Sequence, residues 1–326
     1  MKELKRSPLG FFPTPLHKLE QLNKSYKDYQ LFIKRDDQTG LALGGNKTRK
    51  LEYLFQDAFD NGCDTVITLG AAQSNHCRQT AAAASRLGME CHLLLRKPIP
   101  ESPNGNFLLD ILLGAHIHWF EREHMKEAEE KLINDLIAIG KKPYIIPIGG
   151  SNDIGTFGYF NAIKELKDQL KEIDTEIDYI VFASCSGGTH SGMVLGKKLF
   201  KLDAEILGIS IEKDADPKNS LQQHIINITN EASDLINSDV KIDKEDVQLI
   251  QGYNEAGYGV VTDMEKNAIH MLAKNEGILL DPVYAGRAFA AFTDLLDKEY
   301  FPKGSNILFW HTGGAPANFH YANEIV

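Results

Sequence analysis

Short runs of β-branched and aliphatic residues alternate with segments of helical periodicity along almost the whole chain. The apolar runs predict strands over 64–70, 90–96, 115–120, 143–149, 178–184, 204–211, 247–253, 277–281 and 306–312. Between them, apolar residues spaced three and four apart predict helices, among them 47–61, 74–88, 121–140, 189–200 and 262–277. Strands that alternate with helices in this way are typical of βαβ units, so we predict an α/β fold with largely parallel sheets.

The domain organisation follows from length and from the position of glycine. A chain of 326 residues is long enough for two domains. Glycine-rich stretches at 44–45 and 149–158 are candidate crossings, and several βα units lie between them. We therefore expect a large domain from residues 1–47 and 156–326, with residues 48–155 forming an inserted small α/β domain.

Composition narrows the classes of function. The net charge of −10 argues against a nucleic-acid partner, because phosphate neutralisation needs a basic face. No stretch approaches 18 consecutive apolar residues and the N-terminal residues lack the apolar core of a secretory signal, so we expect neither a membrane-spanning helix nor secretion. The four cysteines form no C-x-x-C pair, which favours reduced thiols in the cytoplasm over disulfides or a zinc site; no metal is expected.

The helix predicted from residue 47 carries an unfavourable cluster of cations in its first turn. Asn46 is a natural N-cap, which places Lys47, Arg49 and Lys50 at the positive end of the helix dipole. A partly desolvated amine beside other cations has a lowered pKa, and its neutral form is the nucleophile that a Schiff base requires. The alternative is that Lys47 is a solvated surface charge, as most lysines are.

The loop SCSGGTHSG at 184–192 predicts an anion site. Gly187 and Gly188 let backbone amides approach a ligand, while Ser186 and Thr189 offer hydroxyls where a helix begins. The alternative is an ordinary tight turn between a strand and a helix. Neither a Walker A motif nor a strand-linked G-x-G-x-x-G occurs, which disfavours nucleotides. A phosphate loop without nucleotide motifs, combined with Lys47, favours pyridoxal 5′-phosphate.

Three further loops follow predicted strands and carry polar residues. Ser74, Asn75 and His76 suit a substrate carboxylate or the pyridoxal hydroxyl, the alternative being a helix cap. Tyr284 is either an acid–base residue or a half-buried tyrosine. Thr312 either hydrogen-bonds a ring nitrogen or satisfies a turn. Because the carboxyl ends of strands in open α/β sheets form ligand sites, we expect these loops to build one composite site.

With these residues assembled, the chain resembles the fold-type II pyridoxal phosphate enzymes related to the tryptophan synthase β subunit. Within them it is most similar to the D-cysteine desulfhydrase and 1-aminocyclopropane-1-carboxylate (ACC) deaminase branch. The motifs that carry the resemblance are IKRDD (33–37), GGNKTRK (44–50), AAQSNHCRQTAA (71–82), PVYAGRA (282–288) and HTGGAPA (311–317), in the family's order. The resemblance implies two open, twisted, mostly parallel sheets flanked by helices, a small domain inserted in a larger one, and a homodimer.

The resemblance also implies roles for individual residues. Lys47 would form the Schiff base, next to Asn46, and Asn75 would lie beside the cofactor ring. Thr312 would face the pyridine nitrogen, and residues 186–189 would hold the phosphate. Ser74, Asn75 and His76 would bind the substrate carboxylate, and Tyr258 and Tyr284 would approach the substrate. Catalysis would then depend on Lys47, Tyr284, Tyr258 and Ser74.

Two positions favour α,β-elimination over ACC deamination. Members of the deaminase subfamily carry glutamate after DPVY and tend to carry leucine at the position of Thr312, whereas this chain has Ala285 and Thr312. We therefore expect α,β-elimination on a small amino acid, with D-cysteine giving pyruvate, ammonia and hydrogen sulfide. ACC deamination, cysteate sulfo-lyase activity and a non-catalytic pyridoxal phosphate carrier are the alternatives. The handedness of the substrate stays open.

Overall fold

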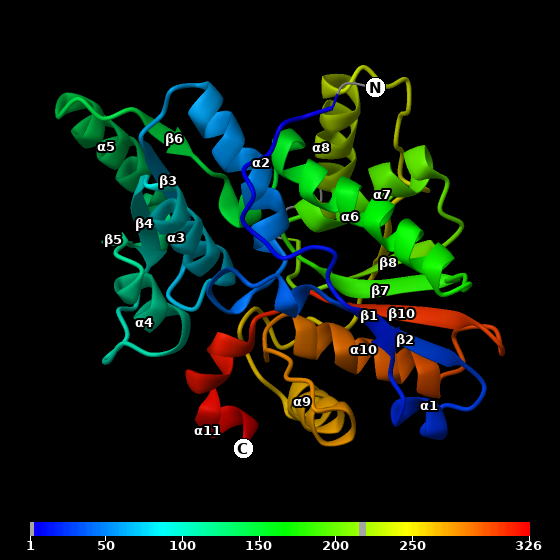
Figure 1. Cartoon of the computed structure of the whole chain (residues 1–326). Helices are drawn as coiled ribbons and strands as arrows, with labels where there is room; N and C mark the ends of the chain where they lie inside the picture. The colour runs from blue at the N-terminus through cyan, green and yellow to red at the C-terminus, as the bar shows by residue number, and fades with distance from the viewer. Residues whose placement is uncertain (1–2, 215–219) are drawn as a thin grey trace.

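The computed structural model describes residues 3–214 and 220–326, and these residues form two sheets (Figure 1). The larger sheet has the strand order β1 (Leu16–Lys18), β2 (Gln30–Arg35), β10 (Asn306–His311), β7 (Tyr179–Ser184), β8 (Glu205–Ser210) and β9 (Gln248–Ile250). The smaller sheet has the order β5 (His116–Phe120), β4 (Glu90–Arg96), β3 (Thr65–Ala71) and β6 (Pro143–Ile145). Apart from the antiparallel β1–β2 pair, the strand pairs of both sheets are parallel.

Helices cover both faces of the larger sheet, because its strands carry apolar side chains on both sides. One face packs against α1 (Leu22–Ser25), α9 (Asp263–Glu276) and α10 (Ala285–Asp297). The other face packs against α6 (Asp153–Glu172) and α7 (Gly188–Phe200), and α8 (Leu221–Leu235) packs in turn on α7. Figure 1 shows α6 and α7 above this sheet and α10 below it. The short helix α11 (Ala322–Ile325) ends the chain.

The smaller sheet is covered in the same way. Its strands pack on one face against α3 (Asn75–Leu87) and α4 (Gly105–Leu112), and on the other against α5 (Met125–Ala138). The helix α2 (Lys47–Asp60) joins the two halves: Leu51, Leu54 and Phe55 lie in the core of the smaller sheet, while Tyr53 packs against α6. The start of α2 is thereby fixed between the two sheets. No helix in the described part of the chain is long and apolar enough to cross a membrane.

The predicted fold class is confirmed, with three differences in the strands, one of which is that the pattern missed the short strand β1. Residues 277–281 form no strand, because Ile278 and Leu280 are buried against the core of the larger sheet without pairing in it. The pattern also missed β2, whose apolar run is followed by Lys34; this lysine is fully buried although its charge is typical of a loop. The domain boundaries at 47/48 and 155/156 stay a prediction.

Candidate active site

A cavity of about 400 Å³ lies at the carboxyl ends of strands from both sheets. β3 contributes its last residues, α3 begins beside it, and the segment after β7 forms another part of the wall. The predicted site residues that line it are Asn46, Lys47, Ser74, Asn75, His76, Ser186, Gly187, Thr189, Tyr258, Tyr284 and Thr312. Gly188 lies directly behind this wall. The structure thus brings together the loops that sequence reasoning assigned to one site, while their individual roles stay predictions.

Lys47 is the first residue of α2, and its amine lies in the cavity wall. Its Nζ donates a hydrogen bond to Asn46 Oδ1 at 3.0 Å. Burial lowers the pKa of Lys47 to about 8, against the smaller opposing effects of Cys185 and Asp281. The neutral amine that a nucleophile or base requires is therefore more populated near neutral pH than in an ordinary lysine.

Asn46 precedes α2 as expected but does not cap it with its side chain. Its backbone is already helical, at φ −61° and ψ −21°, whereas a capping side chain needs an extended backbone to reach the first free amides. The Asn46 Nδ2 instead donates to Thr189 Oγ1 at 3.1 Å. The side chain therefore connects the amine of Lys47 to the loop before α7.

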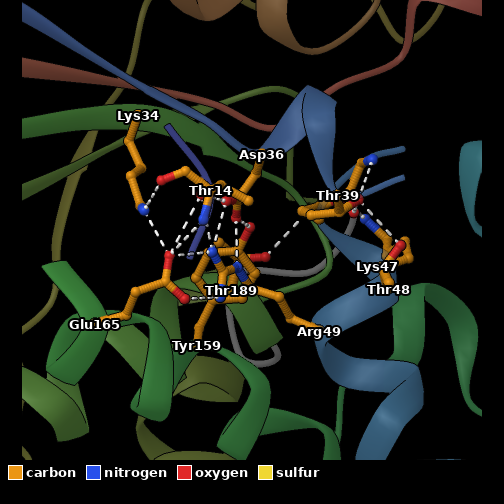
Figure 2. Close-up of polar contacts among 12 residues, drawn as sticks. Thr14, Lys34, Asp36, Thr39, Lys47, Thr48, Arg49, Tyr159, Glu165 and Thr189 are labelled. Atoms are coloured by element: carbon orange, nitrogen blue, oxygen red, sulfur yellow. Dashed lines mark hydrogen bonds and ion pairs between the residues drawn. The ribbon is translucent and has the colours of Figure 1, made fainter. Parts of the chain in front are cut away.

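A buried ion cluster, formed around Arg49, holds α2 against the larger sheet (Figure 2). Arg49 donates to both carboxylate oxygens of Asp36 at 2.8 Å and to those of Glu165 at 2.8 and 2.9 Å. Lys34 Nζ donates to Glu165 at 2.5 Å, and Tyr159 Oη donates to Asp36 at 2.5 Å. The two cations balance the two carboxylates, so the cluster is neutral as a whole. It fixes the first turn of α2, and with it Lys47.

The loop before α7 has the geometry of an anion site. Gly187 has a φ of +86°, which a side chain would strain. A Cβ at Gly188 would lie 2.8 Å from Ser151 Oγ and 3.0 Å from Lys50 Nζ, so only glycine fits there. The backbone amides of Gly187 and Thr189 have no hydrogen-bond partner in the described part of the chain and lie at the start of α7. Free amides at a helix N-terminus bind phosphate.

Lys50 is a site residue that sequence reasoning left without a role. It is fully buried, its Nζ donates to Gly149 O at 3.0 Å and Ser151 Oγ at 3.3 Å, and no carboxylate pairs with it among the described residues. Burial lowers its pKa well below the ordinary value. A buried amine with no acidic partner fits an anionic ligand beside Gly188. The i, i+3 spacing from Lys47, which places both amines on one face of α2, was the available signal.

The start of α3 forms the opposite wall. Ser74 caps the helix, its Oγ accepting from the amide of Cys77 at 3.1 Å, and its hydroxyl proton is left to donate to a ligand, so its predicted site role stays a prediction. Asn75 Oδ1 accepts from Arg78 at 3.1 Å and Asn106 at 2.9 Å, which leaves the Asn75 amide nitrogen as a donor. Burial holds the pKa of His76 well below its ordinary value, so its ring is neutral. This wall offers hydrogen-bond donors at a helix N-terminus, as a carboxylate requires.

Two tyrosines meet at the third side of the cavity. The hydroxyls of Tyr258 and Tyr284 are hydrogen-bonded to each other, and their rings pack edge to face at 5.9 Å. Burial raises the pKa of both phenols. Asp281 fixes the backbone here, because its carboxylate accepts from the amides of Val283, Tyr284 and Ala285 at 3.0, 2.9 and 2.7 Å. Both phenols are therefore protonated near neutral pH and can donate hydrogen bonds to a ligand.

The remaining wall contains a hydroxyl and a thiol. Thr312 lines the cavity, and its backbone carbonyl accepts from the Asn46 amide at 2.9 Å. No described residue pairs with its Oγ1, which leaves the hydroxyl free for a ligand. Cys185, which sequence reasoning did not single out, also lines the cavity, and burial raises the pKa of its thiol to about 12. The thiol is thus protonated and inert as a nucleophile at neutral pH.

Comparisons with known proteins agree with this geometry. The family model described as pyridoxal-phosphate dependent enzyme matches residues 8–313. A D-cysteine desulfhydrase of Klebsiella pneumoniae is 41% identical over 319 residues, which are 95% of this chain and 94% of that protein. A 1-aminocyclopropane-1-carboxylate deaminase of Rhizobium rhizogenes is 36% identical over 333 residues, covering 99% and 98% of the two chains. The solved structure of an ACC deaminase homologue is 38% identical, with a TM-score of 0.90 over 99% of this chain and 96% of that one.

The family match and these relatives confirm the predicted family, cofactor and fold type II architecture. Relatives of similar identity carry both names, so the comparisons establish the group but not which of the two reactions this chain catalyses. The chain therefore belongs to the pyridoxal-phosphate dependent enzymes, in the group that comprises D-cysteine desulfhydrases and ACC deaminases.

Proposed function

We propose that the protein catalyses α,β-elimination on D-cysteine, releasing pyruvate, ammonia and hydrogen sulfide. The observation that carries the choice is the cavity wall at Thr312, which presents a free hydroxyl, while the residue after DPVY is Ala285, buried in the core of the larger sheet. Neither is the carboxylate that deaminase-type members present after DPVY.

The residues present fit pyridoxal phosphate. The free amides of residues 187 and 189, with the hydroxyls of Ser186 and Thr189 and the amine of Lys50, would hold the phosphate. Asn75 would lie beside the ring, Thr312 would hydrogen-bond its nitrogen, and Lys47 would form the covalent link. When bound, the cofactor supplies an electron sink for negative charge at the substrate Cα.

The residues around the cavity divide substrate binding, removal of the Cα proton and departure of the sulfur between them. Ser74, Asn75 and the free amides at the start of α3 bind the substrate carboxylate and fix the Cα–H bond. Lys47 Nζ takes the Cα proton, since its lowered pKa keeps part of it neutral. Tyr284 Oη donates a hydrogen bond to the sulfur, which leaves as hydrosulfide with the electron pair of the Cβ–S bond, and Tyr258 orients this hydroxyl through their shared hydrogen bond. Hydrolysis of the released aminoacrylate gives pyruvate and ammonia.

A substrate panel tests this function. We expect the purified holoenzyme to release pyruvate from D-cysteine with the highest kcat/KM among D-cysteine, L-cysteine, β-chloroalanine, cysteate and 1-aminocyclopropane-1-carboxylate. Pyruvate and 2-oxobutyrate are distinguished by chromatography. Selective release of 2-oxobutyrate from the cyclopropane acid would overturn the proposal in favour of ACC deamination, the activity in the name of the Rhizobium rhizogenes relative. Preference for cysteate would identify a cysteate sulfo-lyase. Inactivity on every substrate of the panel would favour a non-catalytic pyridoxal phosphate carrier.

Replacing Lys50 by methionine is expected to weaken pyridoxal phosphate binding by about 10- to 100-fold. A phosphate beside Lys50 favours its charged form, so the variant loses one charge-assisted contact, and such a contact contributes about 1.5–3 kcal/mol. The measurement is an absorbance titration of the apoprotein with cofactor. Lys171→Met, at an exposed lysine of α6, is the matched control and should bind as wild type does. An unchanged dissociation constant in Lys50→Met would remove Lys50 from the phosphate site.

We further propose that residues 48–155 act as the inserted small domain and that the enzyme is a cytoplasmic homodimer. The smaller sheet lies wholly within this segment, which supports the first statement. The four free thiols fit a reducing compartment. Light scattering of the purified holoenzyme tests the dimer, and a monomeric mass would contradict it.

A further inference from the structure

Three histidines and a glutamate gather at the amino ends of β4 and β5, away from the cavity at the carboxyl ends. Glu90 and His92 are two residues apart on β4 and therefore face the same side of the sheet. His116 is the direct partner of His92 on the parallel neighbour β5, and His118 follows two residues later. The reaction proposed above uses none of these residues. The register of two strands thus concentrates metal-binding side chains at one edge of the smaller sheet.

The ligand atoms are close enough to share one ion. Glu90 Oε1 lies 2.8 Å from His92 Nε2 and 3.7 Å from His116 Nε2, and all three atoms lie within 4.8 Å of one another. Zinc bonds to nitrogen and oxygen are about 2.0–2.2 Å long, so ligand atoms around a tetrahedral ion stand about 3.3–3.5 Å apart. The two measured separations bracket this value. Small side-chain rotations would therefore place an ion among the three atoms.

Two neighbouring side chains hold these ligands in orientation. His92 Nδ1 is 2.9 Å from His118 Nε2, so the nitrogen that faces away from the ion has its own partner. Lys141 Nζ pairs with Glu90 Oε2, which leaves Oε1 for the ion. If an ion takes His92 Nε2, the Nδ1 proton can be donated to His118. Such partners are typical of metal-binding histidines, whose second nitrogen is usually hydrogen-bonded.

Burial and access suit an ion that enters from solvent. The His92 ring is 6% exposed and stacks near-parallel with the His116 ring at 4.7 Å and with the His118 ring at 5.2 Å. The His116 side chain is 57% exposed, which opens the site to solvent on one side. Three protein ligands and an open side leave a fourth position for water.

We propose that Glu90, His92 and His116 form a binding site for a divalent transition metal of the zinc type. His118 and Lys141 are positioning residues, and water completes the coordination. The bound ion connects β4 to β5, and through Lys141 it also restrains the segment that follows α5. The site therefore stabilises the smaller sheet, which carries the substrate-binding start of α3.

Equilibrium dialysis of the chelator-treated holoenzyme against zinc chloride tests the site. We expect about one zinc ion per chain to bind at micromolar concentration, and His116→Gln to weaken this binding by at least about tenfold. His124→Gln is the matched control, because His124 pairs with Glu127 at 2.6 Å on an exposed turn without a third ligand. This variant should bind zinc as wild type does.

Thermal unfolding gives a second measurement that does not depend on catalysis. Zinc should raise the midpoint of the wild type and of His124→Gln, and leave that of His116→Gln unchanged. Equal midpoints of wild type and His116→Gln in chelator would show that the variant folds normally. The proposal is overturned if the wild type binds no zinc at 100-fold molar excess over protein. It is equally overturned if His116→Gln binds the ion as tightly as wild type, or if the control loses it.

Discussion

Replacing Lys47 by alanine lowers kcat for pyruvate release by about 10³- to 10⁴-fold. This corresponds to about 4–5.5 kcal/mol of activation free energy. The loss is large because the same amine forms the covalent link to the cofactor and takes the Cα proton, and no other amine of the described chain both lines the cavity and shares that position. The measurements are pyruvate release and the visible absorbance band that borohydride abolishes in the wild type.

A tyrosine variant separates removal of the Cα proton from departure of the sulfur. Tyr284→Phe should keep the borohydride-sensitive band and the exchange of the Cα proton with deuterated solvent, while its pyruvate release falls. Lys47→Ala should lose the band, the exchange and the product together. A Lys47→Ala protein that retains the band would show that another residue forms the link. Equal loss of exchange in Tyr284→Phe would move the role of the base to the tyrosine pair.

Replacing Arg49 by methionine lowers the free energy of unfolding by about 3–5 kcal/mol. The change leaves Asp36, which is fully buried, and Glu165 without their shared cation. Burial alone would raise the pKa of Asp36, but Arg49 outweighs it and holds this pKa well below its usual range. The carboxylate therefore stabilises the fold above the unfolded-state pKa of about 4 and ceases to do so as pH falls through the lower folded-state value.

Urea unfolding at pH 7, followed by circular dichroism, measures this loss. Lys131→Met is the control, since Lys131 and Asp135 form a surface pair whose side chains are 75% and 59% exposed. Exposed pairs contribute about 0–1 kcal/mol. A loss of less than about 1 kcal/mol in Arg49→Met would mean that the ion cluster around Arg49 does not hold α2 in place.

The fold was predictable wherever apolar runs coincide with strands that pair in a sheet. The prediction failed where a segment is buried without pairing, or pairs although it carries a charge. β3 and β4 are apolar on both faces, as parallel strands are, and their positions agree with the prediction to within one residue. Ile278 shows the opposite case, because its burial comes from packing beside the sheet. Lys34 hid β2, because its charge is neutralised by Glu165, a residue far away in sequence. No local pattern contains that partner.

The candidate site was predictable where chemistry depends on short motifs. Lys47, the loop at 186–189 and the start of α3 were each identifiable from a few neighbouring residues, and the fold brings them to one cavity. Lys50 and Ser151 were not, since their contact joins segments about a hundred residues apart. Arg49 was likewise unassigned, because both carboxylates that bind it lie outside its own helix.

The opening turn of α2 gives three successive cations three different surroundings. Each residue of a helix advances by about 100° and 1.5 Å. Lys47 and Lys50 are therefore about 60° apart: Lys47 lines the cavity and Lys50 donates to Gly149 and Ser151, while Arg49 points away to its carboxylates. Adding or deleting one residue here would turn every later side chain by about 100° and carry Arg49 out of its ion cluster. This stretch can accept some changes of residue type, but it cannot accept a change of length.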